Sequence, residues 1–228
     1  VRKLAPAGAR FIGYGHRLSF AYISSTAWSG GNASRLAESF ARDVTAWDQL
    51  GCLSPHVLYV ENGGTVTPVR FAEMLARELE RMEGIEPRGC VSSVDASAIA
   101  SRRSLYEIRA AHSEETRLWC SRDSTAWTVV FETEPRFQVS CLNRFVYVKP
   151  VANLTDALQA ADSVRGKVST VGLAAGRENF DSLATQLARW GAARISPLGK
   201  MQAPPLCWRH DGRPVLAELV SWTDVERD

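Results

Sequence analysis

The chain has 228 residues, of which 45% are hydrophobic and 23% charged, so it can bury a full core and is not a disordered segment. Its 27 basic and 25 acidic residues are scattered along the chain, which argues against a nucleic-acid binder. No apolar run approaches the roughly 18 residues that span a bilayer, so we expect no membrane span.

Apolar periodicity alternates between short β-like runs and longer helical runs, which is typical of an α/β domain with a mainly parallel sheet. In chain order we expect a strand over 18–24, a helix over 32–49, a strand over 56–61, helices over 67–82 and 95–112, strands over 117–121, 126–132 and 139–151, a helix over 154–164, a strand over 168–174 and a helix over 179–190. Thr67 followed by Pro68 is the expected start of one helix, and Gly191 the expected end of another.

No internal repeat or linker divides the first 190 residues. We therefore expect one three-layer α/β domain over residues 1–195 and an irregular extension packed on it over 196–228, where Pro, Gly and Trp are frequent. The 5 cysteines are an odd number and widely spaced, which favours a reducing cytoplasm over a disulfide framework. The sequence contains no CxxC pair, and no histidine stands at ligand spacing from a cysteine, so no metal site is expected.

Cys52 is the strongest candidate for a reactive residue, because it follows Gly51 in the turn between a predicted helix and a predicted strand. The backbone N–H groups of Cys52, Leu53 and Ser54 in such a turn are expected to lower the thiol pKa and to stabilise an oxyanion. The alternative is an inert cysteine that acts as a small hydrophobe in a tight turn. Spacing alone favours that alternative.

Seven short segments shift the balance towards chemistry. They are GYGHRLSF (13–20), GCLSP (51–55), FETEP (131–135), NR (143–144), VKPV (148–151), VGLAA (171–175) and LGKM (198–201). In this order they resemble the catalytic half of the aldehyde dehydrogenase superfamily and, within it, the acyl-CoA reductases of the LuxC type.

The resemblance implies an aldehyde dehydrogenase-like catalytic domain in which Cys52 accepts the acyl group. Members of this family reduce the acyl-cysteine with a nicotinamide cofactor, here expected to be NADPH, and release a long-chain aldehyde. The implied substrate is a fatty acyl-CoA or an acyl group delivered by an acyl-protein synthetase. A cytoplasmic homo-oligomer is also implied.

His16 lies in a segment that departs from the hydrolytic members of the superfamily, which carry a glutamate there to activate water. Residues 13–16 contain no acidic side chain, and this favours reduction over hydrolysis of the acyl-enzyme. His16 is a candidate to protonate or orient the hemithioacetal oxygen. The alternative is a histidine hydrogen-bonded to a backbone carbonyl at the start of a strand.

Glu132 is the candidate that the resemblance assigns to the nicotinamide-side ribose, with Glu134 as the alternative by position. A solvated loop carboxylate is the non-functional interpretation. The superfamily's N-terminal dinucleotide-binding half has no counterpart in this chain, so we expect the isolated chain not to turn over. Two further functions stay open: a non-catalytic acyl-carrying or assembly module, and a short-chain CoA-acylating aldehyde dehydrogenase.

Overall fold

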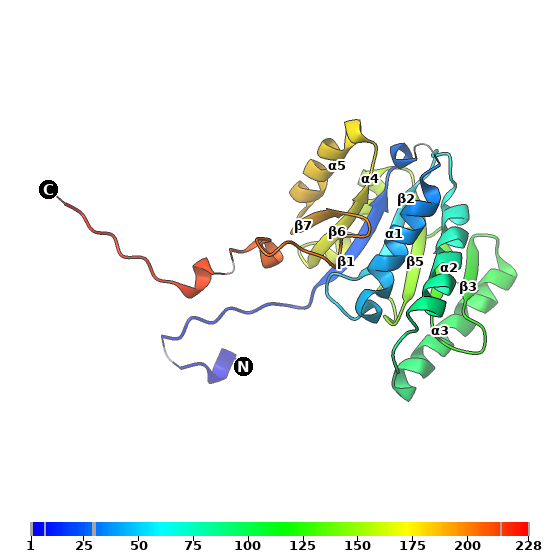
Figure 1. Cartoon of the computed structure of the whole chain (residues 1–228), viewed down its shortest axis with the longest axis horizontal. Coiled ribbons are helices and arrows are strands. Elements are labelled where there is room, and N and C mark those ends of the chain that lie inside the picture. Colours follow the sequence, from blue (N-terminus) through cyan, green and yellow to red (C-terminus); the bar gives the residue numbers. More distant parts are fainter. Residues whose placement is uncertain (1, 7, 29–30, 215, 228) are drawn as a thin grey trace.

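The computed structural model describes residues 2–6, 8–28, 31–214 and 216–227. A seven-stranded sheet in the order β3-β4-β5-β2-β1-β6-β7 forms its centre (Figure 1). The strands are β1 (Leu18–Ile23), β2 (Pro55–Glu61), β3 (Thr116–Cys120), β4 (Thr128–Glu132), β5 (Phe145–Val151), β6 (Val168–Ala174) and β7 (Arg194–Pro197). Every neighbouring pair is parallel except β3 with β4. The expected α/β fold with a mainly parallel sheet is confirmed.

Helices cover both faces of this sheet and make three layers (Figure 1). On one face lie α1 (Ala33–Thr45) and α2 (Pro68–Ile85), and on the other α3 (Ser93–His112), α4 (Leu154–Ala160) and α5 (Arg177–Trp190). Strand β1 shows why both faces need cover: Ala21 and Ile23 join the core under α1 and α2, whereas Phe20 and Tyr22 join the other core. Alternate side chains of a strand point to opposite faces, so a fully buried strand is apolar throughout.

The helix ends follow the expected capping chemistry. The Thr67 side chain accepts a hydrogen bond from the Arg70 N–H at 3.3 Å, and Pro68 occupies the first turn of α2. Gly191 ends α5 in the left-handed conformation, at a φ of 118°. Short 3-10 helices occur at Arg2–Leu4, Ser25–Ala27, Ala46–Gln49, Asp162–Val164, His210–Gly212 and Ala217–Leu219.

Among the elements that are shorter than the sequence predicts, two are cut short for the same reason. The helix expected over 32–49 ends as α1 at Thr45, because residues 47–49 adopt left-handed φ angles of 57°, 49° and 64°. The strand expected over 139–151 begins only at Phe145, because residues 142–144 have φ angles of 60°, 54° and 64°. The sequence prediction was wrong at the end of the first helix and at the start of the strand. In both places a left-handed segment precedes the next strand, β2 in the first case and β5 in the second.

Strand β7 was not expected, and it spans position 195, where the sequence analysis places the boundary of the extension. After β7, Leu198 and Met201 are buried in the core under α1 and α2. Further on, the His210 ring stacks on Tyr14 with centroids 4.8 Å apart. The two end segments leave the body on the same side (Figure 1). Among the described residues, no helix combines the length and apolarity needed to cross a bilayer.

Candidate active site

Cys52 lies in a turn at the edge of the sheet where β1, β2 and β5 begin. The Ser54 N–H closes this turn by donating to the Gly51 carbonyl oxygen at 2.9 Å. The buried Ser19 hydroxyl donates to the Cys52 carbonyl oxygen at 2.8 Å and accepts from the Thr170 N–H at 3.1 Å. The turn is thereby attached to β1 and β6, while Cys52 itself stays exposed to solvent.

Gln49 fixes the segment before Cys52 to the segment before β5. Its fully buried amide group donates to the carbonyl oxygens of Pro55 at 2.7 Å and Phe145 at 2.8 Å, and accepts from the Phe145 N–H at 2.8 Å. A second link joins the two left-handed segments, since Arg144 pairs with Asp48 at 2.7 Å. Left-handed backbone in residues other than glycine costs of order 1–3 kcal/mol each, so these contacts are what holds the edge in shape.

His16 lies at the same edge as Cys52. Strands β1 and β2 run parallel, with Ser19 opposite Pro55. His16 precedes Ser19 by three positions, and Cys52 precedes Pro55 by three positions. Gly13 and Gly15 lead into strand β1 and not into a helix, so they do not form the glycine-rich loop of a dinucleotide-binding helix. The structure thus brings two of the three predicted site residues, Cys52 and His16, to one edge.

The pKa of the Cys52 thiol is raised, opposite to the direction expected from the sequence. Partial desolvation is the largest cause, the charge of Asp211 adds to it, and the residue's own backbone N–H opposes it. Fewer backbone N–H groups can stabilise the thiolate than the sequence predicts, because the Ser54 N–H donates to the Gly51 carbonyl oxygen. Asp211 is held beside the site by Arg17 at 3.0 Å and Ser169 at 3.3 Å.

His56 is a site-edge residue that the sequence analysis missed. The Ser140 N–H donates to His56 Nδ1 at 3.2 Å, and Ser140 Oγ lies 3.0 Å from the same nitrogen. Burial, helped by the charge of His16, lowers the pKa of His56 to about 4, so the ring is neutral at pH 7. It ties the segment before β5 to β2, a role that no local sequence signal marks because Ser140 is distant along the chain.

Glu132 ends strand β4, and this places it at the edge of the sheet opposite to Cys52. The two edges differ because β4, β5 and β2 are parallel, while Glu132 is the last residue of β4 and Cys52 precedes the first residue of β2. The Glu132 carboxylate pairs with the buried Lys149 at 3.1 Å and with Arg109 at 2.6 Å. Lys149 also donates to the Glu134 carbonyl oxygen at 2.5 Å. The structure does not bring either glutamate together with Cys52 and His16.

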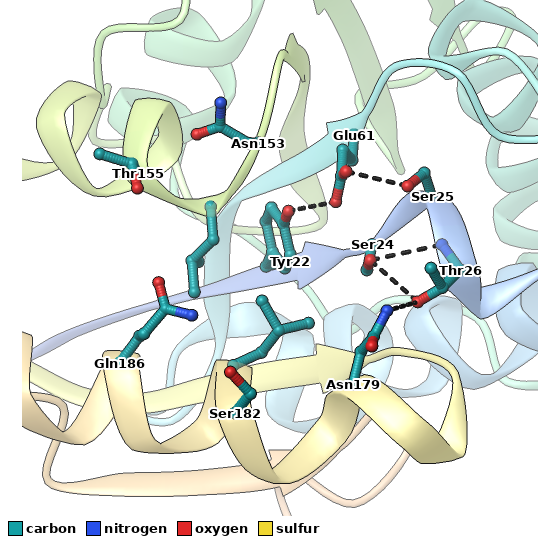
Figure 2. A pocket seen from close by; sticks show the side chains of 12 residues that line it. Tyr22, Ser24, Ser25, Thr26, Glu61, Asn153, Thr155, Asn179, Ser182 and Gln186 are labelled. Carbon is teal, nitrogen blue, oxygen red and sulfur yellow. Dashed lines mark hydrogen bonds between the residues drawn. The ribbon is translucent and has the colours of Figure 1, made fainter.

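A cavity of about 250 Å³ lies at this opposite edge, beyond the ends of β1, β2 and β6 (Figure 2). Glu61 accepts hydrogen bonds there from the Tyr22 hydroxyl at 2.5 Å and the Ser25 hydroxyl at 2.8 Å. Hydroxyl and carboxamide groups make up most of the remaining lining, which contains no basic side chain. Within the described ranges, no group of three or more His, Cys, Asp or Glu residues can hold a metal ion.

Solved structures define the class of this fold. A bifunctional proline utilization A (PutA) protein superposes with a TM-score of 0.62 at 16% identity, over 84% of this chain and 19% of that one. A 1-pyrroline-5-carboxylate dehydrogenase from Thermus gives 0.57 at 13% identity, over 84% and 37%. The P. syringae indole-3-acetaldehyde dehydrogenase AldA gives 0.56 at 15% identity, over 78% and 37%. The fold is that of an aldehyde dehydrogenase domain, and the chain spans less than two fifths of each of these structures.

The family is narrower than the fold class. The family model described as acyl-CoA reductase (LuxC) matches residues 1–222, which is nearly the whole chain. The chain therefore belongs to the LuxC acyl-CoA reductase family. Among curated proteins, none matches the sequence.

Proposed function

We propose that this chain carries the acyl-transfer centre of an acyl-CoA reductase, with Cys52 as the nucleophile. One observation supports this proposal above all: Cys52 is exposed in a turn just before β2, and the Ser19 hydroxyl holds that turn by a hydrogen bond. The chain belongs to the acyl-CoA reductase family. His16 at the same edge supports it.

The chemistry begins with loss of the Cys52 proton. The thiolate attacks the carbonyl carbon of the acyl thioester, the carbon–sulfur bond to coenzyme A breaks, and the coenzyme leaves as a thiolate that takes up a proton. One thioester replaces another, so the step is close to balanced in energy. The acyl-cysteine stays electrophilic enough to accept hydride.

Reduction of the acyl-cysteine requires a nicotinamide cofactor, for which NADPH is our expectation, and this cofactor supplies the hydride when bound. The described residues at the Cys52 edge contain no glycine-rich helix start for a dinucleotide, and Glu132 lies at the other edge. The acyl transfer is therefore the part of the reaction for which this chain's residues account. His16 is proposed to donate a proton to the oxygen of the reduced intermediate.

The proposed substrate is a fatty acyl-CoA, or an acyl group supplied by an acyl-protein synthetase, used by a cytoplasmic homo-oligomer. These finer statements follow from the family resemblance. A short-chain acyl-CoA is the alternative substrate.

A non-catalytic acyl-carrying or assembly module is the second candidate. One feature favours it: desolvation raises the pKa of the Cys52 thiol above its ordinary value, whereas an activated nucleophile has a lowered pKa.

Acylation of the purified chain separates these candidates. We expect incubation with tetradecanoyl-CoA to place one hydroxylamine-labile acyl group on Cys52, found by intact mass and peptide mapping. Cys52→Ala should abolish the label, and a matched control at another exposed cysteine, Cys90→Ala, should keep it. Absence of the label, or a label spread over several cysteines, would count against the proposed nucleophile. Acetyl-CoA in parallel separates the long-chain substrate from the short-chain alternative.

A further inference from the structure

The loop after β7 reaches back to the Cys52 turn through one side chain. Gln202 Nε2 donates a hydrogen bond to Ser54 Oγ at 2.9 Å, and the same nitrogen lies 3.4 Å from the backbone oxygen of Asp43. Gln202 Oε1 lies against Gly51, where an added Cβ would be 3.4 Å from it. Gln202 therefore touches both residues that flank Cys52 and Leu53 in the turn.

Gln202 is held in place by the residues just before it. The buried Asp43 carboxylate on α1 accepts the Gly199 N–H at 2.6 Å and the Met201 N–H at 2.9 Å. Met201 is fully buried against Gly172, where an added Cβ would meet Met201 Sδ at 2.6 Å. The backbone that carries Gln202 has little freedom, so its amide group reaches the turn already oriented.

The turn is thus held from two sides. Ser19 bonds the Cys52 carbonyl oxygen from the sheet, and Gln202 bonds the buried Ser54 hydroxyl from the loop after β7. Among the residues that the structure describes, Gln202 is the one side chain that hydrogen-bonds Ser54 Oγ.

From this geometry we infer that Gln202 is a positioning residue for Cys52: it holds the turn of residues 51–54 in the conformation from which the thiol attacks a thioester. The inference rests on the proposed function of Cys52. It adds to the site a residue that belongs to none of the seven motif segments and lies far from Cys52 along the chain.

A positioning role predicts a split between two reactions of the same thiol. Alkylation by iodoacetamide needs only the thiolate, whereas acyl transfer from tetradecanoyl-CoA also needs the sulfur and the carbonyl to be aligned. We expect Gln202→Ala to slow acylation of Cys52 on the order of tenfold, the effect of one lost hydrogen bond at a buried partner. The alkylation rate should stay within about twofold of wild type, because the thiol keeps its surroundings.

Three further variants complete the experiment. Gln202→Glu keeps the length and lets the Ser54 hydroxyl donate to the new carboxylate. It should therefore recover most of the ratio of acylation to alkylation rate, a ratio that cancels the effect of the added charge on the amount of thiolate. Gln202→Met keeps the length without the hydrogen bond and replaces the alanine variant if that variant does not fold. Gln159→Ala, at an exposed position on α4, is the matched control and should behave as wild type.

Two results would overturn the inference. One is acylation of both the alanine and the methionine variants at the wild-type rate, and the other is an equal loss of acylation and alkylation together with a lowered midpoint of thermal unfolding. A wild-type chain that is alkylated but never acylated at Cys52 would overturn the proposed function, and this inference with it.

Discussion

Asp211 carries a negative charge to the Cys52 thiol from the far end of the chain, and Arg17 and Ser169 hold it there. Because a nearby negative charge disfavours the thiolate, Asp211→Asn should lower the pKa of Cys52. The pH dependence of iodoacetamide labelling at Cys52 checks this, and its midpoint should move to lower pH. Asp181→Asn, on α5, is the matched control. An unchanged midpoint in both variants would show that Asp211 does not act on the thiol.

Gln49 makes three hydrogen bonds with backbone groups of Pro55 and Phe145, and its own side chain is fully buried. Truncation in Gln49→Ala should lower the free energy of unfolding by about 3 kcal/mol, because each unsatisfied buried group costs about 1–3 kcal/mol. Urea unfolding followed by circular dichroism measures the change. Gln159→Ala should alter stability by less than about 0.5 kcal/mol. A small effect at Gln49 would mean that water or a rearranged backbone satisfies these groups.

Helices and strands with clear periodicity were predictable from the sequence, and the departures have a common physical origin. Residues 47–49 and 142–144 look locally like continuations of a helix and of a strand. Their left-handed backbone is stabilised by Gln49, Asp48 and Arg144, whose partners lie on the other segment. Strand β7 is short and only partly buried, so it shows no alternation that a sequence can reveal.

The contact between α1 and the loop after β7 should make stability depend on pH. Burial raises the pKa of Asp43 to about 7, and the N–H groups of Gly199 and Met201 oppose this only in part. An aspartate titrates near 3.9 in an unfolded chain, so between about pH 4 and about pH 7 the folded chain binds more protons. This contribution to stability is complete below about pH 4 and is lost as the pH rises through about 7.

Asp43→Asn removes this titration. We expect its free energy of unfolding to change less between about pH 4 and about pH 7 than that of wild type, measured by urea unfolding at several pH values. Asp181→Asn again serves as the control. Parallel curves for wild type and Asp43→Asn would contradict the raised pKa.

At the scale of the whole molecule, the parallel sheet decides which candidate residues meet. Cys52 and His16 could be predicted as neighbours of one site because both precede parallel strands, and the ends of such strands share an edge. Glu132 was expected at the end of a strand, and it is there. The ends of these parallel strands lie at the opposite edge of the sheet from the strand starts, where Cys52 and His16 lie. Gln202 and His56 could not be found from sequence, since their roles depend on hydrogen bonds to Ser54 and Ser140, which are distant from them along the chain.

The separation of the two sheet edges has a practical consequence for anyone who wants to watch Cys52 react. The turn at residues 62–64 follows β2 and opens onto solvent at the edge away from Cys52. A fluorophore attached there would follow the strand that Cys52 precedes, and would lie a full strand length away from the thiol. Such a label would leave the thiol that accepts the acyl group unblocked.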